Sequence, residues 1–289
     1  MTKSFSDTEV QQATPVVVIN LDRDSDRLAW HSENCLRVGL RFERIAAVDA
    51  KDESMLAKIE DLRSPSFRLS YAEAACILSH RKAWQYLLDT EHPHLAILED
   101  DLHLSEDFPL LLRNELIPKN ADLIKLEVPS GKVSFAQKPS ASFLGRKLHR
   151  LITKAYGSGA YIVSRQCASK LLEATKHCSE PVDVILFDPQ SSIWEQFEAL
   201  QLIPAPCIQD VNLCRLTSSE QLFESAIENE RNTVKDIRKS ENKKKKNSIP
   251  LKKLWRYLWC IYQGANPLRH KEYIPLDLGH PDTSVKNSK

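Results

Sequence analysis

The sequence predicts an α/β fold with a mainly parallel central sheet covered by helices. The first observation is the apolar run at residues 15–21, PVVVINL, which is typical of a strand buried on both faces. The second is a helical pattern over residues 25–38, followed by Gly39 as a suitable C-terminal stop. The third is another strand-like run at residues 41–47. A strand, a helix and a strand in this order favour parallel pairing of the two strands.

Strands and helices continue to alternate along the chain. Ser70 and Glu73 form an S-x-x-E capping box at the start of a helix, which His92 and Pro93 should end. We expect short strands at residues 95–98, 121–126 and 159–164, a helix at 165–175, a second helix at 190–200 and an extended stretch at 203–211. Residues 128–150 contain two prolines and several serines, and their length predicts a mobile functional loop.

The composition excludes several classes of protein. The 289 residues are 42% hydrophobic and 27% charged, which is enough for a full-sized globular core. A net charge of +1 gives no reason to expect a nucleic-acid partner. The seven cysteines include no C-x-x-C pair, which argues against a disulfide framework and a zinc site. Without a signal peptide or a spanning apolar stretch, the protein is expected in the cytoplasm.

Three adjacent acids, Glu99, Asp100 and Asp101, follow the predicted strand at residues 95–98. Such an acidic triplet is costly to bury, because like charges repel and each loses its hydration. A divalent cation would compensate, and Mg²⁺ or Mn²⁺ often bridges carboxylates to substrate phosphates. The alternative is a solvated loop in which Asp101 only caps a turn. A phosphate-binding glycine loop is absent, so nucleotide binding would need another device.

Several motifs, taken together, resemble glycosyltransferase family 25. They are the opening I-N-L-x-R-x-x-x-R at residues 19–27, A-V-D at 47–49, the helix block at 73–80 that ends in L-S-H, E-D-D at 99–101, A-Y-I-V-S at 160–164, and P-x-D at 181–183. The likeness spans roughly residues 14–215, and the motifs follow in the family's order. Ala72 and Ala75 replace two glycines of the family pattern. Whether this chain uses the family's usual donor and acceptor is therefore an open question.

The resemblance implies a GT-A-like, Rossmann-type fold that binds a nucleotide sugar. It also implies transfer of a hexose, with galactose expected, from a UDP-sugar to a lipopolysaccharide or lipooligosaccharide acceptor, with inversion at the anomeric carbon. The acceptor would be a glycolipid or an oligosaccharide. Two other readings remain: a metal-dependent phosphotransferase or nuclease, and a scaffold protein that binds nucleotide sugars without turnover.

The expected metal ligands are Asp101 and Glu99, holding Mn²⁺ or Mg²⁺ against the donor diphosphate. The candidate donor-binding residues are Asn20, Arg23, Arg27, Glu73, His80, Glu99 and Asp100. Four of these residues also have a structural alternative. Arg23 or Arg27 could form a surface ion pair, Glu73 could serve only as a helix cap, and His80 could be a buried hydrogen-bonded residue. Gln209 or Asp210 is a weaker candidate for a third ligand.

The base that accepts the acceptor's proton should be a carboxylate. Asp183 lies in the family-like P-x-D element and is the first candidate, and Asp188 is the second. Either could instead be a structural aspartate.

Four regions are expected: a disordered N-terminus at residues 1–13, a catalytic domain at 14–217, a charged helix and linker at 218–247, and a basic amphipathic tail at 248–289, irregular towards its end. Residues 243–246 are all lysine, and Trp255 and Trp259 lie one helical turn apart on an apolar face. This pattern suits a helix on an anionic membrane surface, which would place the enzyme peripherally at the inner membrane. The alternative is a helix that packs on the catalytic domain.

Overall fold

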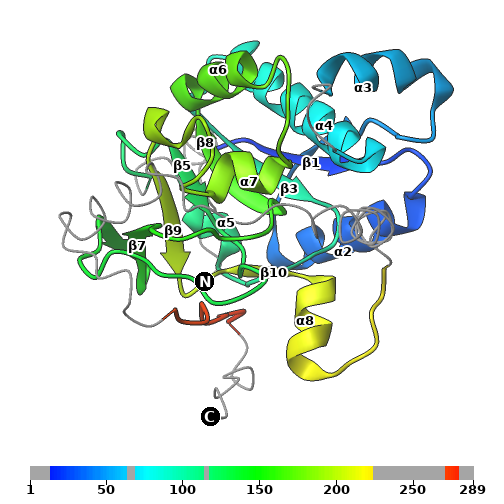
Figure 1. Cartoon of the computed structure of the whole chain (residues 1–289). Helices are drawn as coiled ribbons and strands as arrows, with labels where there is room; N and C mark the ends of the chain where they lie inside the picture. The colour runs from blue at the N-terminus through cyan, green and yellow to red at the C-terminus, as the bar shows by residue number, and fades with distance from the viewer. Residues whose placement is uncertain (1–13, 64–68, 114–116, 224–270, 280–289) are drawn as a thin grey trace, which may run out of the picture.

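The computed structural model describes residues 14–63, 69–113, 117–223 and 271–279. Its centre is an eight-stranded sheet in the order β2-β1-β3-β8-β5-β9-β7-β6, accompanied by a two-stranded sheet of β10 and β4 (Figure 1). The strands are β1 (Val16–Asn20), β2 (Glu43–Ala46), β3 (His94–Glu99), β4 (Leu102–Leu104), β5 (Leu123–Lys125), β6 (Ala141–Phe143), β7 (Arg146–Arg150), β8 (Ala160–Ser164), β9 (Ala199–Ile203) and β10 (Cys207–Gln209).

The predicted α/β, GT-A-like organisation is confirmed, and its parallel opening is present. Strand β1 pairs in parallel with both β2 and β3, and β5 pairs in parallel with β9. Strand β8 lies antiparallel between β3 and β5, while β7 and β6 extend the far edge in antiparallel fashion. The sheet as a whole is therefore mixed, and the end that carries β1 and β3 has the Rossmann-type arrangement.

Helices cover both faces of the sheet, as Figure 1 shows for α4 and α6 on one side and α2 on the other. They are α2 (Ser25–Val38), α3 (Leu56–Leu62), α4 (Tyr71–Leu88), α5 (Phe108–Leu111), α6 (Arg165–Ala174), α7 (Val182–Phe187) and α8 (Asp210–Thr217), with 3-10 turns η1 (Glu53–Met55) and η3 (Trp194–Gln196). Val17 and Ile19 of β1 join the core under α4, while Val16 and Val18 join the core on the α2 side. Because successive strand residues point to opposite faces, an unbroken apolar strand serves both cores.

Two local predictions are confirmed in detail. Helix α2 ends at Gly39, whose φ of 74° is the left-handed conformation that glycine adopts readily. Helix α4 begins with a complete capping box, in which the Ser70 hydroxyl accepts from the Glu73 amide and the Glu73 carboxylate accepts from the Ser70 amide. Both helices are thus fixed by signals that lie within a few residues of their ends.

Two predictions of secondary structure are wrong. The expected mobile loop at residues 128–150 contains the β6–β7 hairpin, which Arg146 fastens through a 2.8 Å ion pair with Asp107. The expected helix at residues 190–200 is only the short turn η3 followed by β9, which lies inside the sheet between β5 and β7. In both cases pairing with distant strands determines the structure, and the local pattern does not contain that information.

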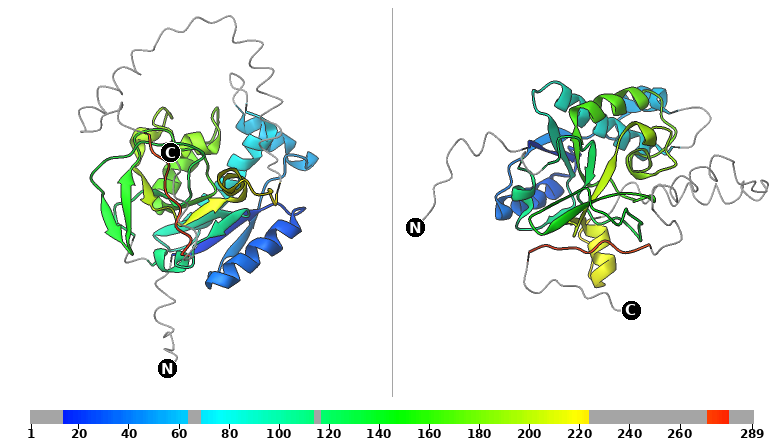
Figure 2. Two further views of the ribbon diagram at one scale, coloured as in Figure 1. Left: turned by 90° about the horizontal axis from the view of Figure 1, so that it is seen from below. Right: turned by 90° about the vertical axis from the view of Figure 1, so that its left-hand side faces the viewer.

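Residues 271–279 are irregular, as expected, but they pack against residues of the main α/β unit through isolated bridges. The Glu272 amide donates to the Val133 carbonyl at 2.8 Å, the Ala205 amide donates to the Pro275 carbonyl at 2.8 Å, and Ile274 is buried. Figure 2 shows the stretch running extended along one side of the molecule.

Some expectations concern residues that the structure does not describe. The N-terminus at 1–13, most of the charged segment at 218–247 and the amphipathic segment at 251–262 lie outside the described residues. Within the described part of the chain, the six cysteines are free thiols, and none of the helices could span a bilayer.

Candidate functional site

The acidic triplet lies at the carboxyl end of β3, beside the end of the parallel strand β1. Glu99 is the last residue of β3, Asp100 and Asp101 form the turn after it, and Asn20 ends β1 alongside. These ends open into a cavity of about 380 Å³ whose lining includes all four residues. Ligands of open α/β sheets bind at this edge, so the fold places the triplet where a nucleotide is expected.

Asp100 is buried and engaged by two donors, one at the end of β1 and one in α2. The Asn20 side-chain amide donates to it at 2.6 Å, and the Arg27 guanidinium forms an ion pair with it. Burial raises the pKa of Asp100 above its ordinary value, although Arg27 and Asn20 act in the opposite direction. Arg27 also lies 3.4 Å from an oxygen of Asp101, so its guanidinium faces two members of the triplet.

Glu99 is surrounded by hydrogen-bond donors. Its Oε1 accepts from the Ser158 hydroxyl at 3.1 Å and lies 3.4 Å from His80 Nε2, and its Oε2 accepts from the Gln209 amide at 3.0 Å. Burial raises the pKa of Glu99, but the hydrogen bonds and charges of its neighbours outweigh that effect and leave its pKa below the ordinary value. Glu99 is therefore held as a carboxylate.

Asp101 is the member of the triplet with the weakest compensation. Burial, together with the charge of Glu99, raises the pKa of Asp101 to about 7, and Arg27 only partly offsets this. Its nearest amide donor, Gln209 Nε2, lies 3.5 Å away. A cation next to Asp101 and Glu99 would relieve this repulsion, so the residues present fit a divalent metal.

His80 belongs to a buried chain of hydrogen bonds behind Glu99. The Trp84 indole donates to the Tyr161 hydroxyl at 2.9 Å, and His80 Nδ1 lies 2.8 Å from the same hydroxyl. If the phenol proton is directed to Nδ1, the proton of His80 is on Nε2, which faces Glu99. His80 thus belongs to the cavity lining, and it also fits the structural alternative of a buried, hydrogen-bonded histidine.

Two sets of side chains could hold a metal ion. Glu99 and Asp101 offer carboxylate oxygens, and the Gln209 amide could present its oxygen after a flip; such a set suits Mg²⁺ or Mn²⁺. Cys76, His80 and Glu99 have ligand atoms within 4.8 Å of one another, a set that would suit a softer metal. The lack of a C-x-x-C pair argued against a zinc site. The second cluster could not be seen from that pattern, because it forms only where Glu99 of β3 lies beside Cys76 and His80 of α4.

Arg23 and Glu73 line the cavity but have protein partners. Arg23 forms an ion pair with Asp49, and its Nε lies 3.7 Å from Asp24. Glu73 is buried and makes the capping-box contact with Ser70 described above. The structural alternatives raised for these two residues are therefore present, alongside their position at the cavity.

The two candidate bases lie at opposite ends of α7. Asp183, in its first turn, is buried, lines the cavity and lies 3.5 Å from the Gly157 amide. Asp188 follows the helix and is outside the cavity lining, where it lies 3.2 Å from the Lys154 ammonium. The structure brings only Asp183 into the site.

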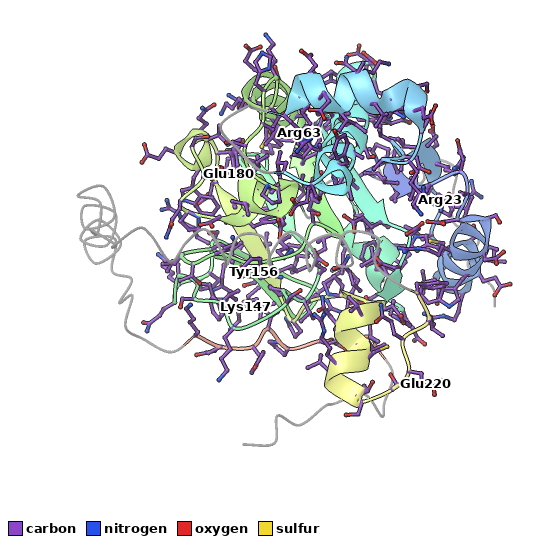
Figure 3. All side chains as sticks on the ribbon, turned by 45° about the vertical axis from the view of Figure 1, so that its right-hand side comes forward. Arg23, Arg63, Lys147, Tyr156, Glu180 and Glu220 are labelled. Carbon is purple, nitrogen blue, oxygen red and sulfur yellow. The ribbon has the colours of Figure 1, made fainter. Side chains whose placement is uncertain are left out.

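Sequence reasoning missed Glu127 and Phe223 as contributors to the site. Glu127 is fully buried next to the triplet and pairs with Lys125. Phe223 lies on the cavity rim, with the Arg27 guanidinium carbon 5.4 Å from its ring centroid. Tyr156 lines the cavity with half of its surface exposed. In Figure 3, Arg23 lies beside α2 and Tyr156 lies towards the middle of the view. Only the K-L-E pattern at residues 125–127 gave a local signal, two opposite charges within an apolar strand.

Comparison with known proteins gives consistent findings. Residues 13–186 match the family described as Glycosyltransferase family 25 (LPS biosynthesis protein). A Haemophilus influenzae protein named as a glycosyltransferase is 30% identical over 226 residues, covering 75% of this chain and 76% of that protein. The lacto-N-neotetraose biosynthesis glycosyltransferase LgtB of Neisseria meningitidis serogroup B is 26% identical, covering 74% and 82%. The lipooligosaccharide biosynthesis protein lex-1 of Haemophilus influenzae is 27% identical, covering 76% of each.

Proposed function

Because this chain belongs to glycosyltransferase family 25, we propose that it transfers a hexose, with galactose expected, from a UDP-sugar to a lipopolysaccharide or lipooligosaccharide acceptor. The observation that carries the proposal is the convergence of the acidic triplet, Asn20, Arg27 and Asp183 on one cavity. The names of the relatives from Haemophilus and Neisseria support this class of acceptor.

In the proposed donor site, the carboxylates of Glu99 and Asp101 would hold a divalent cation, Mn²⁺ or Mg²⁺. Bound there, the cation would neutralise the charge that develops on the leaving UDP. Asn20 and Arg27 fix Asp100, and with it the turn that carries Asp101. His80, Ser158 and Gln209 fix Glu99. The network thereby holds the carboxylates in place before the donor binds.

Asp183 is the proposed base. The acceptor hydroxyl oxygen would attack the anomeric carbon from the face opposite UDP, and its proton would pass to the Asp183 carboxylate. The bond from the anomeric carbon to the diphosphate oxygen breaks as the new bond forms, so the anomeric configuration inverts. A position on the cavity wall near the Gly157 amide supports this assignment for Asp183.

A membrane location is the remaining part of the proposal. The basic run at residues 243–246 and the tryptophans at 255 and 259 favour docking on the anionic inner leaflet, where a lipid-linked acceptor would lie. Sedimentation with anionic liposomes tests it. Full-length protein should co-sediment and be released by salt, and a chain ending at residue 242 should not bind.

The test of the function is a screen of UDP-sugars with Mn²⁺, following UDP release and product formation on truncated lipooligosaccharide. UDP-galactose should give the fastest transfer, and the product should have the inverted anomer. Binding of UDP without turnover of any sugar would instead support a nucleotide-sugar-binding scaffold.

A further inference from the structure

Residues 157–159, Gly-Ser-Gly, form a short strap between the donor side of the cavity and Asp183. On the donor side, the Ser158 hydroxyl donates to Glu99 at 3.1 Å, and the Glu99 amide donates to the Gly159 carbonyl at 2.7 Å. On the other side, the Gly157 amide lies 3.5 Å from Asp183. The strap therefore touches both the proposed metal ligand and the proposed base.

A buried ion pair holds the strap from behind. Lys125 and Glu127 are both fully buried, with their charged atoms 2.7 Å apart. Lys125 donates to the Gly157 carbonyl at 2.5 Å, and Glu127 accepts from the Gly159 amide at 2.8 Å. The Lys125 ammonium also lies 4.4 Å from the ring centroid of Phe187, in the same helix as Asp183.

The fit between Glu127 and the strap is tight enough to require glycine on both sides. A Cβ at residue 157 would lie 2.8 Å from Glu127 Oε1, and a Cβ at residue 159 would lie 2.9 Å from Oε2. Gly157 also has a φ of 98°, which L side chains rarely adopt. The two glycines and the carboxylate thus form one interlocked unit.

Stability alone does not account for this arrangement. Glu127 Oε2 is buried without a hydrogen-bond partner among the described residues, and an unsatisfied buried carboxylate oxygen costs free energy. A buried ion pair is often no more stabilising than apolar residues of similar size. Buried polar atoms without a partner are expected mainly where the placement of the side chain serves function.

We propose that Lys125 and Glu127 are positioning residues for glycosyl transfer, which set the strap so that Glu99 and Asp183 keep their relative placement. The inference rests on the proposed function, because it assigns the pair a role in that same site. Neither side chain lines the cavity, so both act through the strap.

The decisive variant is the double substitution Lys125→Met/Glu127→Gln. It removes both buried charges together, keeps an acceptor for the Gly159 amide and deletes the donor to the Gly157 carbonyl. Compared with Lys125→Met alone, which leaves Glu127 unpaired, the double variant should recover most of the melting temperature. Its kcat for UDP-galactose should stay reduced about tenfold or more, while the KM for the donor changes little.

Hydrogen exchange of the strap amides gives a readout independent of turnover. Exchange at residues 157–159 should rise about tenfold or more in the double variant, while exchange in β3 stays at the wild-type rate. Asp107→Asn is the matched control, because it removes the charge that pairs with the buried Arg146 away from the cavity. It should lower stability and leave strap exchange and kcat unchanged.

The inference is overturned if kcat returns together with the melting temperature, or if strap exchange in the double variant matches the wild type. If the wild-type protein turns over no UDP-sugar, the proposed function fails. Strap exchange then still decides whether the pair sets the position of these residues.

Discussion

Asn20 donates a 2.6 Å hydrogen bond to Asp100, and this bond ties the end of β1 to the acidic triplet at the end of β3. The Asn20 side-chain oxygen accepts from Arg44 of β2 at 2.9 Å. The single side-chain amide of Asn20 therefore contacts one residue on each side of β1, Arg44 in β2 and Asp100 after β3. The triplet is therefore held from the side of β1 by contacts within the protein itself.

Asn20→Ala should lower the free energy of unfolding by about 1–3 kcal/mol, because Asp100 loses a buried donor. It should also weaken binding of UDP with Mn²⁺, since the turn that carries Asp101 loses its anchor. Urea denaturation and calorimetric titration measure the two effects. Unchanged stability would mean that the hydrogen bond to Asp100 contributes little.

Asp101→Asn should abolish transfer while the metal-free protein keeps or gains melting temperature. The pKa of Asp101 is about 7 in the folded protein, against about 3.9 in an unfolded chain. The folded state holds this proton more tightly, so ionisation costs stability as the pH rises from about 4 to 7. The gain from Asn should therefore be largest above pH 7 and vanish near pH 4. A clear loss of melting temperature at pH 8 in chelator would show a structural role instead.

Asp183→Asn should reduce transfer by about 10²–10⁴-fold, the range usual for loss of a general base. Binding of UDP with Mn²⁺ should be unchanged, because the carboxylate acts on the acceptor. Asp188→Asn is the matched control, since Asp188 pairs with Lys154 outside the cavity lining. If Asp183→Asn and Asp188→Asn reduced transfer equally, Asp183 could no longer be assigned as the base in preference to Asp188.

The capping box separates two roles of Glu73. Ser70→Ala should cost about 1 kcal/mol of stability, the usual effect of losing an N-cap. Glu73→Gln keeps an oxygen for the Ser70 amide, so it should preserve stability. If Glu73 also binds the donor, its affinity for UDP with Mn²⁺ should fall. An unchanged affinity would leave Glu73 as a cap only.

The sequence predicted those parts of the fold that local signals determine. The apolar run of β1, Gly39 after α2 and the Ser70–Glu73 box each depend on neighbours within a few residues. The β6–β7 hairpin was missed because Arg146, a charged residue in a segment rich in polar residues, is buried by its ion pair with the distant Asp107. The helix expected at residues 190–200 ran into the start of β9, because the place of β9 between β5 and β7 is a long-range contact.

The same distinction applies to the site. The acidic triplet, Asn20, Arg27 and Asp183 were identified from motifs, and the structure brings them to one cavity. Asp188 was a candidate on the same apolar context, but the turn after α7 directs it to Lys154. Glu127 was missed because its surroundings include Gly157 and Gly159, which are distant in the sequence, as well as the neighbouring Lys125.

The most direct test of the central claim is donor turnover with and without a chelator. Purified full-length protein is incubated with UDP-galactose and acceptor, first with Mn²⁺, then with excess EDTA, then with Mn²⁺ restored beyond the chelator. The account predicts transfer with Mn²⁺, none in EDTA and full recovery on restoration, with Asp101→Asn inactive throughout. Transfer that continues unchanged in EDTA, or in Asp101→Asn, would contradict it.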